Sequence, residues 1–138
     1  MDFPVSGTCQ CGQVKITLLK PPQKVVACHC KECQKLSSSP YSVTALFGKP
    51  DLKIEGQLST WNRVADSGSD NTAKFCPSCG NRVYHFNPSQ PELIKLKLKP
   101  VGIQDTSIFK PQAHVWTKEK QAWFVLPDDV PSYSEMPA

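Results

Sequence analysis

The 138-residue chain is long enough for one domain with a single core, and its apolar share of 39% is somewhat low for a globular protein. Its net charge of +4 comes from scattered cations, which argues against nucleic acid as a partner. The N-terminus MDFPVSGTCQ lacks an apolar run, and no stretch approaches the roughly 20 apolar residues that a membrane helix needs. We therefore expect a soluble, cytoplasmic protein that binds neither nucleic acid nor membranes and keeps its cysteines reduced.

Alternating apolar and polar residues predict a mainly β fold made of short strands. Thirteen prolines argue against long helices, because each fixes φ and removes a backbone donor. One short helix is expected to begin near Cys30 and to end before Pro40, since the residue before a proline disfavours helical geometry. The predicted strands, in chain order, are residues 13–19, 24–27, 41–47, 51–56, 57–62, 92–99, 113–117 and 122–126.

The segments between and after these strands are polar. Residues 64–71 (VADSGSDN) predict a flexible loop, and residues 118–120 predict a hairpin between the last two strands. The tail, residues 126–138, is rich in proline and acidic residues and is expected to lie on the surface without regular structure. We expect residues 1–138 to form a single domain.

The segment ELIKLKLK, residues 92–99, alternates most strictly and places Lys95, Lys97 and Lys99 on one face. We interpret it as a half-exposed strand whose lysines discourage pairing with another sheet edge. The alternative is a cationic wall that faces an acidic ligand. The three tryptophans are expected to lie in the core rather than to form a binding platform.

The seven cysteines fall into three groups, and two of these groups complement each other. CQCG contains Cys9 and Cys11, and CPSCG contains Cys76 and Cys79. Two thiolates around a tight turn can reach one metal ion at about 2.3 Å each, and the glycine after the second thiol permits the turn. Together the two groups predict a closed structural zinc site, which would contribute on the order of 10 kcal/mol to folding.

The remaining cysteines, Cys28, Cys30 and Cys33, predict a second metal site with three protein ligands. Cys30 and Cys33 have helical spacing near a helix start, where the helix dipole favours thiolate over thiol. Cys28 can reach the same ion from the extended chain. Three protein ligands and an open fourth position are typical of a catalytic zinc. The sequence therefore predicts two zinc ions per chain, one structural and one catalytic.

A fourth protein ligand would instead make the second site structural. His85 and His114 are the histidine candidates for that ligand, and an aspartate or glutamate is a further alternative. His29 lies between two of the cysteines, so its side chain is expected to point away from the metal. Glu32 is expected to be a solvated helix residue.

These motifs resemble the glutathione-dependent formaldehyde-activating enzymes, also called S-(hydroxymethyl)glutathione synthases, a family that includes centromere protein V. The similarity covers nearly the whole chain, through GTCQCGQVKI, CHCKECQKLSSSPY, FCPSCGNRVY and HVWTKEKQAWFVLPDDVPSY. It implies an all-β fold of small sheets that meet in a tent shape, and the same division into a structural and a catalytic zinc. Two residues depart from the family pattern: Gln34 stands where a basic residue is usual, and Ser38 stands where glycine is usual.

The resemblance implies a carbon–sulfur lyase that joins glutathione, or a related small thiol, to formaldehyde or another aldehyde. Zinc deprotonates a coordinating thiol, whereas a free thiol with a pKa of about 8.5 is mostly protonated at neutral pH. We therefore expect the second zinc to activate the thiol; polarisation of the carbonyl is the other possibility. The alternative function is a non-catalytic two-zinc module that carries a thiol adduct or a protein partner.

The residues after the second cysteine group are the candidates for substrate contacts. Lys35 could pair with a carboxylate of glutathione, although a solvated helix lysine is the simpler interpretation. Ser37, Ser38 and Ser39 could position the substrate or relay a proton, although serine before proline is also common turn chemistry. No separate general acid or base stands out in the sequence.

Overall fold

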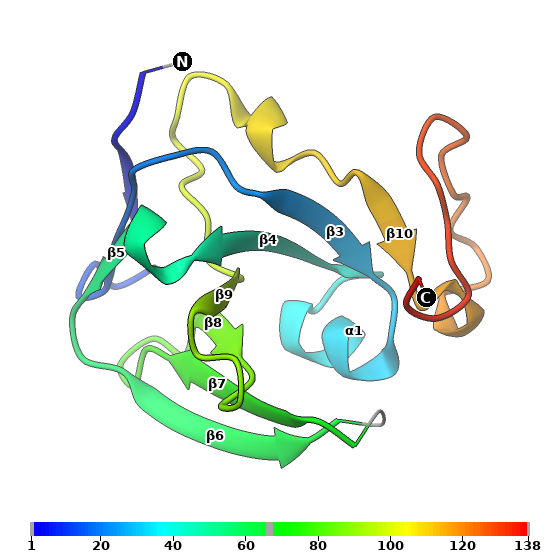
Figure 1. Ribbon diagram of the computed structural model, residues 1–138, viewed down its shortest axis with the longest axis horizontal. Coiled ribbons are helices and arrows are strands. Elements are labelled where there is room, and N and C mark those ends of the chain that lie inside the picture. Colours follow the sequence, from blue (N-terminus) through cyan, green and yellow to red (C-terminus); the bar gives the residue numbers. More distant parts are fainter. Residues whose placement is uncertain (1, 66–67, 138) are drawn as a thin grey trace.

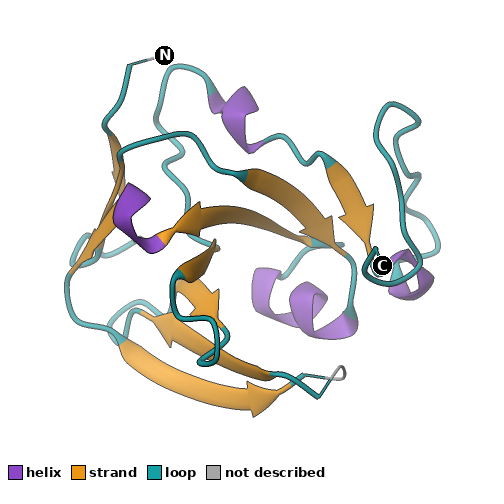
Figure 2. Ribbon diagram, viewed as in Figure 1, coloured by secondary structure: helices purple, strands orange, loops and turns teal. Residues whose placement is uncertain are grey.

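The computed structural model describes residues 2–65 and 68–137 and confirms the mainly β prediction. Strands dominate, as Figure 2 shows. The strands are β1 (Val5–Thr8), β2 (Lys15–Leu18), β3 (Lys24–Cys28), β4 (Ser42–Gly48), β5 (Leu52–Glu55), β6 (Ser59–Val64), β7 (Asp70–Phe75), β8 (Arg82–Phe86), β9 (Leu93–Leu96) and β10 (Ala113–Val115). The helical elements in the described ranges are α1 (Lys31–Ser37) and the 3₁₀ turns η1 (Lys49–Asp51), η2 (Thr106–Phe109) and η3 (Thr117–Glu119).

The strands form two sheets. The smaller sheet has the antiparallel order β1-β2-β5, and the larger one has the order β10-β3-β4-β9-β8-β7-β6. β10 runs parallel to β3, and the other neighbours in the larger sheet are antiparallel. The larger sheet curves, so that α1 lies on its hollow side between the β3–β4 part and the β6–β7 part (Figure 1). This curvature creates the space beside the second cysteine group.

The period of two along the strands sends alternate side chains to two different environments. On one face of β4 and β9, Ala45, Phe47, Ile94 and Leu96 are buried in a core that also includes Ile16 of the small sheet. The residues between them project from the other face, on the hollow side of the sheet. The core therefore lies between the two sheets, and the hollow side is free to form a site.

The strand β9 corrects one interpretation of the sequence. It lies between β4 and β8 in the interior of the larger sheet, so its lysines do not protect a sheet edge. Lys95 and the following Lys97 are partly buried and line a cavity on the hollow side. The alternation predicted the two faces correctly, but the polar face meets a cavity and not bulk solvent.

The predicted helix is confirmed, with the sulfur of Cys30 at its N-cap. The chain leaves the helix through Ser38, whose φ of 49° is in the left-handed region that favours glycine. No helix among the described residues has both the length and the apolar character needed to cross a membrane. Of the loop predicted at 64–71, residues 66 and 67 lie outside the described residues.

The predicted strand at 122–126 and the hairpin before it are wrong. Trp116, with φ 57°, ends the extended chain after β10 and leads into the turn η3. The edge of β10 pairs instead with the C-terminal tail: the His114 N–H donates to the Pro131 carbonyl (N···O 3.0 Å), and the Tyr133 N–H donates to the His114 carbonyl (N···O 2.8 Å). An occupied edge cannot accept the predicted strand.

The tryptophans do not lie in the core as the sequence suggested. Trp61 is 47% exposed and Trp123 is 68% exposed. Trp116 is half-buried. The Trp61 ring instead forms part of the cavity wall on the hollow side of the sheet.

Candidate metal centres and the adjoining cavity

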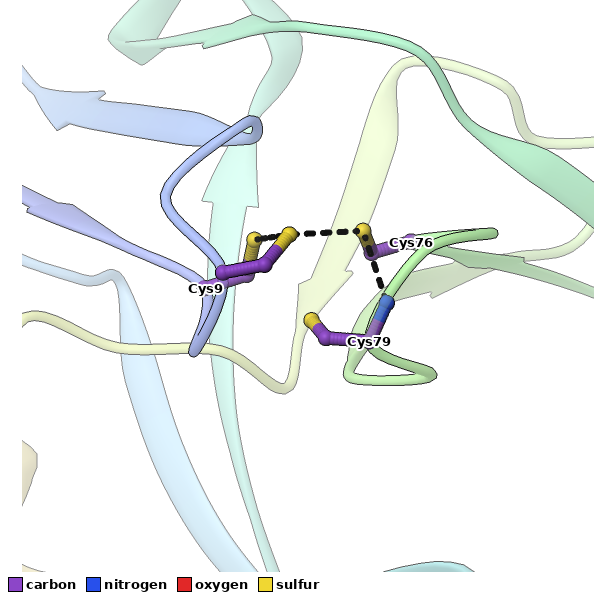
Figure 3. A group of neighbouring side chains, drawn as sticks. Cys9, Cys76 and Cys79 are labelled. Atoms are coloured by element: carbon purple, nitrogen blue, oxygen red, sulfur yellow. Dashed lines mark hydrogen bonds between the residues drawn. The ribbon is translucent and has the colours of Figure 1, made fainter.

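The first cysteine group joins the two sheets. Cys9 and Cys11 lie in the connection between β1 and β2, and Cys76 and Cys79 lie in the connection between β7 and β8. Their four sulfur atoms lie within 4.8 Å of one another, and the Cys9–Cys11 and Cys11–Cys76 Sγ···Sγ distances are 3.6 and 3.7 Å (Figure 3). Four sulfurs at about 2.3 Å from one ion would be about 3.8 Å apart. The group therefore fits a tetrahedral metal site.

Hydrogen bonds to Cys76 Sγ favour its thiolate form, which is the form that binds metal. The Gln13 side-chain amide donates to Cys76 Sγ (N···S 3.1 Å), and the Cys79 backbone N–H donates to the same sulfur (N···S 3.5 Å). Burial raises the pKa of Cys76, but these donors outweigh it and lower the pKa to about 6. The turn glycines have the positive φ that the sequence required, 87° at Gly12 and 81° at Gly80.

The second cysteine group lies at the end of β3 and the start of α1. Cys28 is the last residue of β3, Cys30 caps α1, and Cys33 lies in the first turn of the helix. The three sulfurs are within 4.8 Å of one another, and the Cys33 N–H donates to Cys30 Sγ (N···S 3.3 Å). Among the described residues no other cysteine, histidine, aspartate or glutamate joins this group. The strand end and the helix start thus supply a set of three thiol ligands.

The pKa values of the three thiols reflect their close contact with one another. Hydrogen bonds from Cys28 and Cys30 lower the pKa of Cys33 far below its usual range, and the nearby Lys97 ammonium lowers it further. The same interaction with Cys30 and Cys33 raises the pKa of Cys28. The three sulfurs thus interact strongly with one another in a small volume. A divalent cation would replace the thiol protons, so three cysteine donors at this spacing fit zinc.

The histidines considered as a fourth ligand are engaged elsewhere. His114 Nδ1 pairs with His29 Nε2 at 2.8 Å, and the rings of Tyr41 and Phe124 pack against His29. Burial, followed by the charges of His114 and Lys120, lowers the pKa of His29 to about 4. As expected, the side chain of His29 is not part of the cysteine group.

His85 is held in the wall of the cavity. Its Nε2 lies 3.0 Å from Arg82 Nη1, and its Nδ1 lies 3.4 Å from the Asn71 side-chain amide. Because a guanidinium can only donate, Nε2 accepts from Arg82, and a neutral ring then carries its proton on Nδ1. That proton needs an acceptor, which is the Asn71 amide oxygen when the amide turns its oxygen, and not its NH2 group, toward Nδ1. Burial, and then the charges of Lys97 and Arg82, lower the pKa of His85 to about 3. His85 is therefore neutral at physiological pH.

The second cysteine group opens onto a cavity of about 550 Å³ on the hollow side of the larger sheet, and Cys28 and Cys33 are part of its lining. Its apolar wall includes Val26, Leu46 and Trp61. Its described lining contains one carboxylate, that of Glu32, against six cationic side chains. The cations are Lys24, Lys35, Arg63, Arg82, Lys95 and Lys97. Such a surface attracts anionic ligands.

The substrate residues suggested by the sequence are only partly near this cavity. Lys35 lines it, but its Nζ pairs with Glu32 Oε1 at 3.1 Å. Ser37 Oγ donates to the Cys33 carbonyl (O···O 2.7 Å), and Ser39 Oγ contacts the Tyr41 carbonyl. Ser38 is the exposed residue that ends α1. In the structure the serines stabilise the turn after the helix and do not line this cavity.

Sequence reasoning missed Arg63, Arg82 and Trp61 as cavity residues. Arg82 lies over the Trp61 ring, with Cζ 5.5 Å from the ring centroid. A cation beside an aromatic ring recurs in many surfaces. Arg82 lies in the segment FCPSCGNRVY, but nothing in that segment links its side chain to Trp61 or to a cavity. The one signal in the sequence for a cationic cavity is the alternation of lysines in residues 92–99, whose second interpretation is a wall that faces an acidic ligand.

Gln34, which departs from the family pattern, has a structural role. Its Nε2 donates to the carbonyls of His29 (2.7 Å) and Glu119 (2.9 Å), and its Oε1 accepts from Gln121 Nε2 (2.6 Å). These bonds tie α1 to the segment that follows β10. Gln34 therefore stabilises the position of the helix that carries Cys30 and Cys33.

Comparison with known proteins agrees with this arrangement. The model of the family "Glutathione-dependent formaldehyde-activating enzyme" matches residues 4–119. A relative from Halomonas elongata, named "Putative glutathione-dependent formaldehyde-activating enzyme", is 25% identical over 126 residues, which cover 86% of this chain and 78% of the relative. A crystal structure of a Rhodobacter sphaeroides protein shares the fold, with a TM-score of 0.56 and 23% identity over 78% of this chain and 97% of the other. The chain belongs to the family of glutathione-dependent formaldehyde-activating enzymes.

Proposed function

We propose that this protein is a zinc-dependent carbon–sulfur lyase that adds glutathione, or a related small thiol, to an aldehyde. The product is a hemithioacetal of the S-(hydroxymethyl)glutathione type, and the reverse reaction releases thiol and aldehyde. The observation that carries the proposal is the position of Cys28, Cys30 and Cys33 at the edge of a cationic cavity. Family membership supports glutathione and formaldehyde as the substrates to test first.

The two cysteine groups have different roles in this proposal. Cys9, Cys11, Cys76 and Cys79 would hold a structural zinc ion between the two sheets, and Cys28, Cys30 and Cys33 would hold a second zinc ion. With three protein ligands, the second ion would lower the pKa of a substrate thiol so that the thiolate is present at neutral pH.

The cavity suits the rest of a glutathione molecule. Glutathione carries two carboxylates and one ammonium group, and six cationic side chains line the cavity beside the three cysteines. Arg63 and Arg82 lie on the β6–β8 side, opposite Cys28 on β3, so they are placed to bind carboxylates while the sulfur lies near the cysteines. Val26 and Leu46 add apolar surface to the same lining, against which the rest of the substrate can pack.

The proposal is tested by the rate of hemithioacetal exchange. Exchange NMR with glutathione and ¹³C-formaldehyde measures the exchange rate without protein and with the zinc-loaded protein, and the difference is the acceleration. We expect acceleration by the wild type and its loss in Cys33→Ser, with the circular dichroism spectrum unchanged. Folded wild-type protein with two zinc ions that does not accelerate exchange would favour the non-catalytic binding module instead.

A further inference from the structure

One partly buried cation near the second cysteine group has no carboxylate partner. Lys97, which directly follows β9, donates from Nζ to Thr44 Oγ1 (2.6 Å) and to Ser42 Oγ (3.4 Å). Both hydroxyl-bearing residues are buried. None of the ion pairs found among the described residues includes Lys97. Burying an ammonium group without a counter-charge is costly, so a counter-charge is expected close by.

The position of Lys97 identifies that counter-charge. Ser42 is the cross-strand partner of Cys28, the last residue of β3. Through its bond to Ser42, Lys97 thus lies at the strand position beside Cys28, and it lines the same cavity as Cys28 and Cys33. A divalent ion with three thiolates has a net charge of −1, which one ammonium neutralises. Two of the three Nζ protons bond to hydroxyls, which leaves one for the cavity.

The other cations of the cavity are less well placed. Lys95 lies two residues earlier on β9, about 7 Å farther along the strand, opposite His85 and Leu46. Arg82 contacts His85 through Nη1 and lies over the Trp61 ring, and among the described residues no hydrogen bond links it to the three cysteines or to Ser42. Lys35 pairs with Glu32. Lys24 begins β3, four residues before Cys28, and Arg63 lies on β6, which is separated from β4 by three strands. Lys97 is therefore the cation best positioned beside the three sulfurs.

We propose that Lys97 is a catalytic residue whose ammonium group donates a hydrogen bond to the aldehyde oxygen as the thiolate adds. This inference rests on the proposed function. The thiol first loses its proton to water; its sulfur then forms the C–S bond, and the C=O π electrons move to oxygen. Lys97 stabilises the resulting alkoxide, which takes a proton from water. Thiol and aldehyde thus give a hemithioacetal with no net change in protons, and Lys97 donates a hydrogen bond without transferring its proton.

A binding experiment tests the inference without turnover. Cobalt-substituted protein reports thiol binding through its visible absorption, and two small probes differ at the relevant position: mercaptoacetate carries an anionic oxygen near its sulfur, and ethanethiol carries none. A charge-assisted hydrogen bond should make the wild type prefer mercaptoacetate by about tenfold or more. Lys97→Met should lose that preference. Lys95→Met removes an equal charge from the same cavity and should weaken mercaptoacetate binding less than Lys97→Met does.

A second variant covers the case in which Lys97→Met does not fold. Thr44→Val keeps the volume and the charge but removes the hydroxyl that anchors Nζ, and it should reduce the preference for mercaptoacetate by about threefold. Two results would overturn the role of Lys97 but leave the proposed function standing. One is equal affinity of the wild type for the two thiols, and the other is an equal loss of mercaptoacetate affinity in the Lys95 and Lys97 variants. Protein that binds two metal ions but neither thiol would overturn the proposed function as well.

Kinetics separate transition-state stabilisation from simple charge balance. Loss of an oxyanion donor typically costs about 10² to 10³ in kcat, so Lys97→Met should lower kcat by this factor at saturating glutathione. Its zinc content should stay at the wild-type value. If kcat were retained and only the KM for glutathione rose, Lys97 would serve thiol binding and the catalytic role would be wrong.

Discussion

The two cysteine groups use the same ligand atoms in different surroundings. In the group of four, Cys9 and Cys76 are buried in the core, and the ligands come from turns of both sheets. In the group of three, every ligand is partly exposed, and all come from one strand end and one helix start beside a cavity. Both groups have the same thiolate chemistry. What distinguishes a site that stabilises the fold from one that can react is the number of protein ligands and whether a cavity adjoins them.

The largest expected effect comes from breaking the group of four. Cys76→Ser removes a buried ligand that connects the two sheets, and a structural zinc site contributes on the order of 10 kcal/mol to folding. We expect this variant to lose both its cooperative thermal transition and its native circular dichroism spectrum. Cys33→Ser is the matched change in the other group and should retain both. A Cys76→Ser variant that melts like the wild type would show that the group of four does not stabilise the fold.

The second prediction concerns the charge of the cavity. Arg63→Met should raise the KM for glutathione by about threefold to tenfold and leave kcat nearly unchanged, because a contact with a remote carboxylate stabilises ground state and transition state equally. Added salt should reduce the difference between variant and wild type. Lys15→Met, which removes an exposed cation from the small sheet, is the control. An equal effect of both variants would mean that net charge, and not the cavity, attracts the substrate.

The third prediction concerns pH and the buried histidine pair. The pKa of His29 is lowered from its usual value of 6.5 to about 4. The unfolded chain therefore binds a proton at a higher pH than the folded chain, and stability is lost as the pH falls from about 6.5 to 4. Near pH 5 the wild-type unfolding free energy should fall more steeply than that of His29→Gln, by up to about 1.4 kcal/mol per pH unit.

Urea unfolding at a series of pH values measures both slopes. The two proteins keep the same seven cysteines, so proton uptake by released thiols contributes equally to each. Parallel pH profiles would contradict the assignment of a neutral, buried His29 to the folded state.

The smallest expected effect is at the end of α1. Ser38 has a left-handed φ of 49°, and a non-glycine residue there costs about 1 kcal/mol. Ser38→Gly should therefore raise the unfolding free energy by a few tenths to about 1 kcal/mol, since the greater freedom of glycine in the unfolded chain offsets part of the gain. Ser39→Gly, one residue later, should give no gain. A destabilised Ser38→Gly variant would show that the serine side chain contributes more than its backbone strain costs.

The strands and the grouping of the cysteines could be predicted because both depend on local spacing. Alternation indicates which residues share a face, and CxC and CxxC spacings indicate which thiols can reach one ion. Alternation does not show what the polar face meets, so Lys95 and Lys97 were assigned to a sheet edge although β9 lies in the sheet interior.

The remaining errors have a similar cause. The segment 122–126 has the composition of a strand, but the tail already occupies the neighbouring edge of β10. Trp61 and Arg63 share one face of β6 by alternation, but Arg82 reaches them from β8, across β7, and joins them in one cavity through the pairing of strands. These features depend on contacts between residues distant in sequence, which no local pattern in a single chain reports.

The most direct test of the central claim is the metal content and fold of Cys33→Ser beside the wild type. Elemental analysis should give two zinc ions per wild-type chain and one per Cys33→Ser chain, and the variant should keep the wild-type circular dichroism spectrum. One zinc ion in the wild type, or an unfolded Cys33→Ser variant, would contradict the division into a stabilising site and a reactive site.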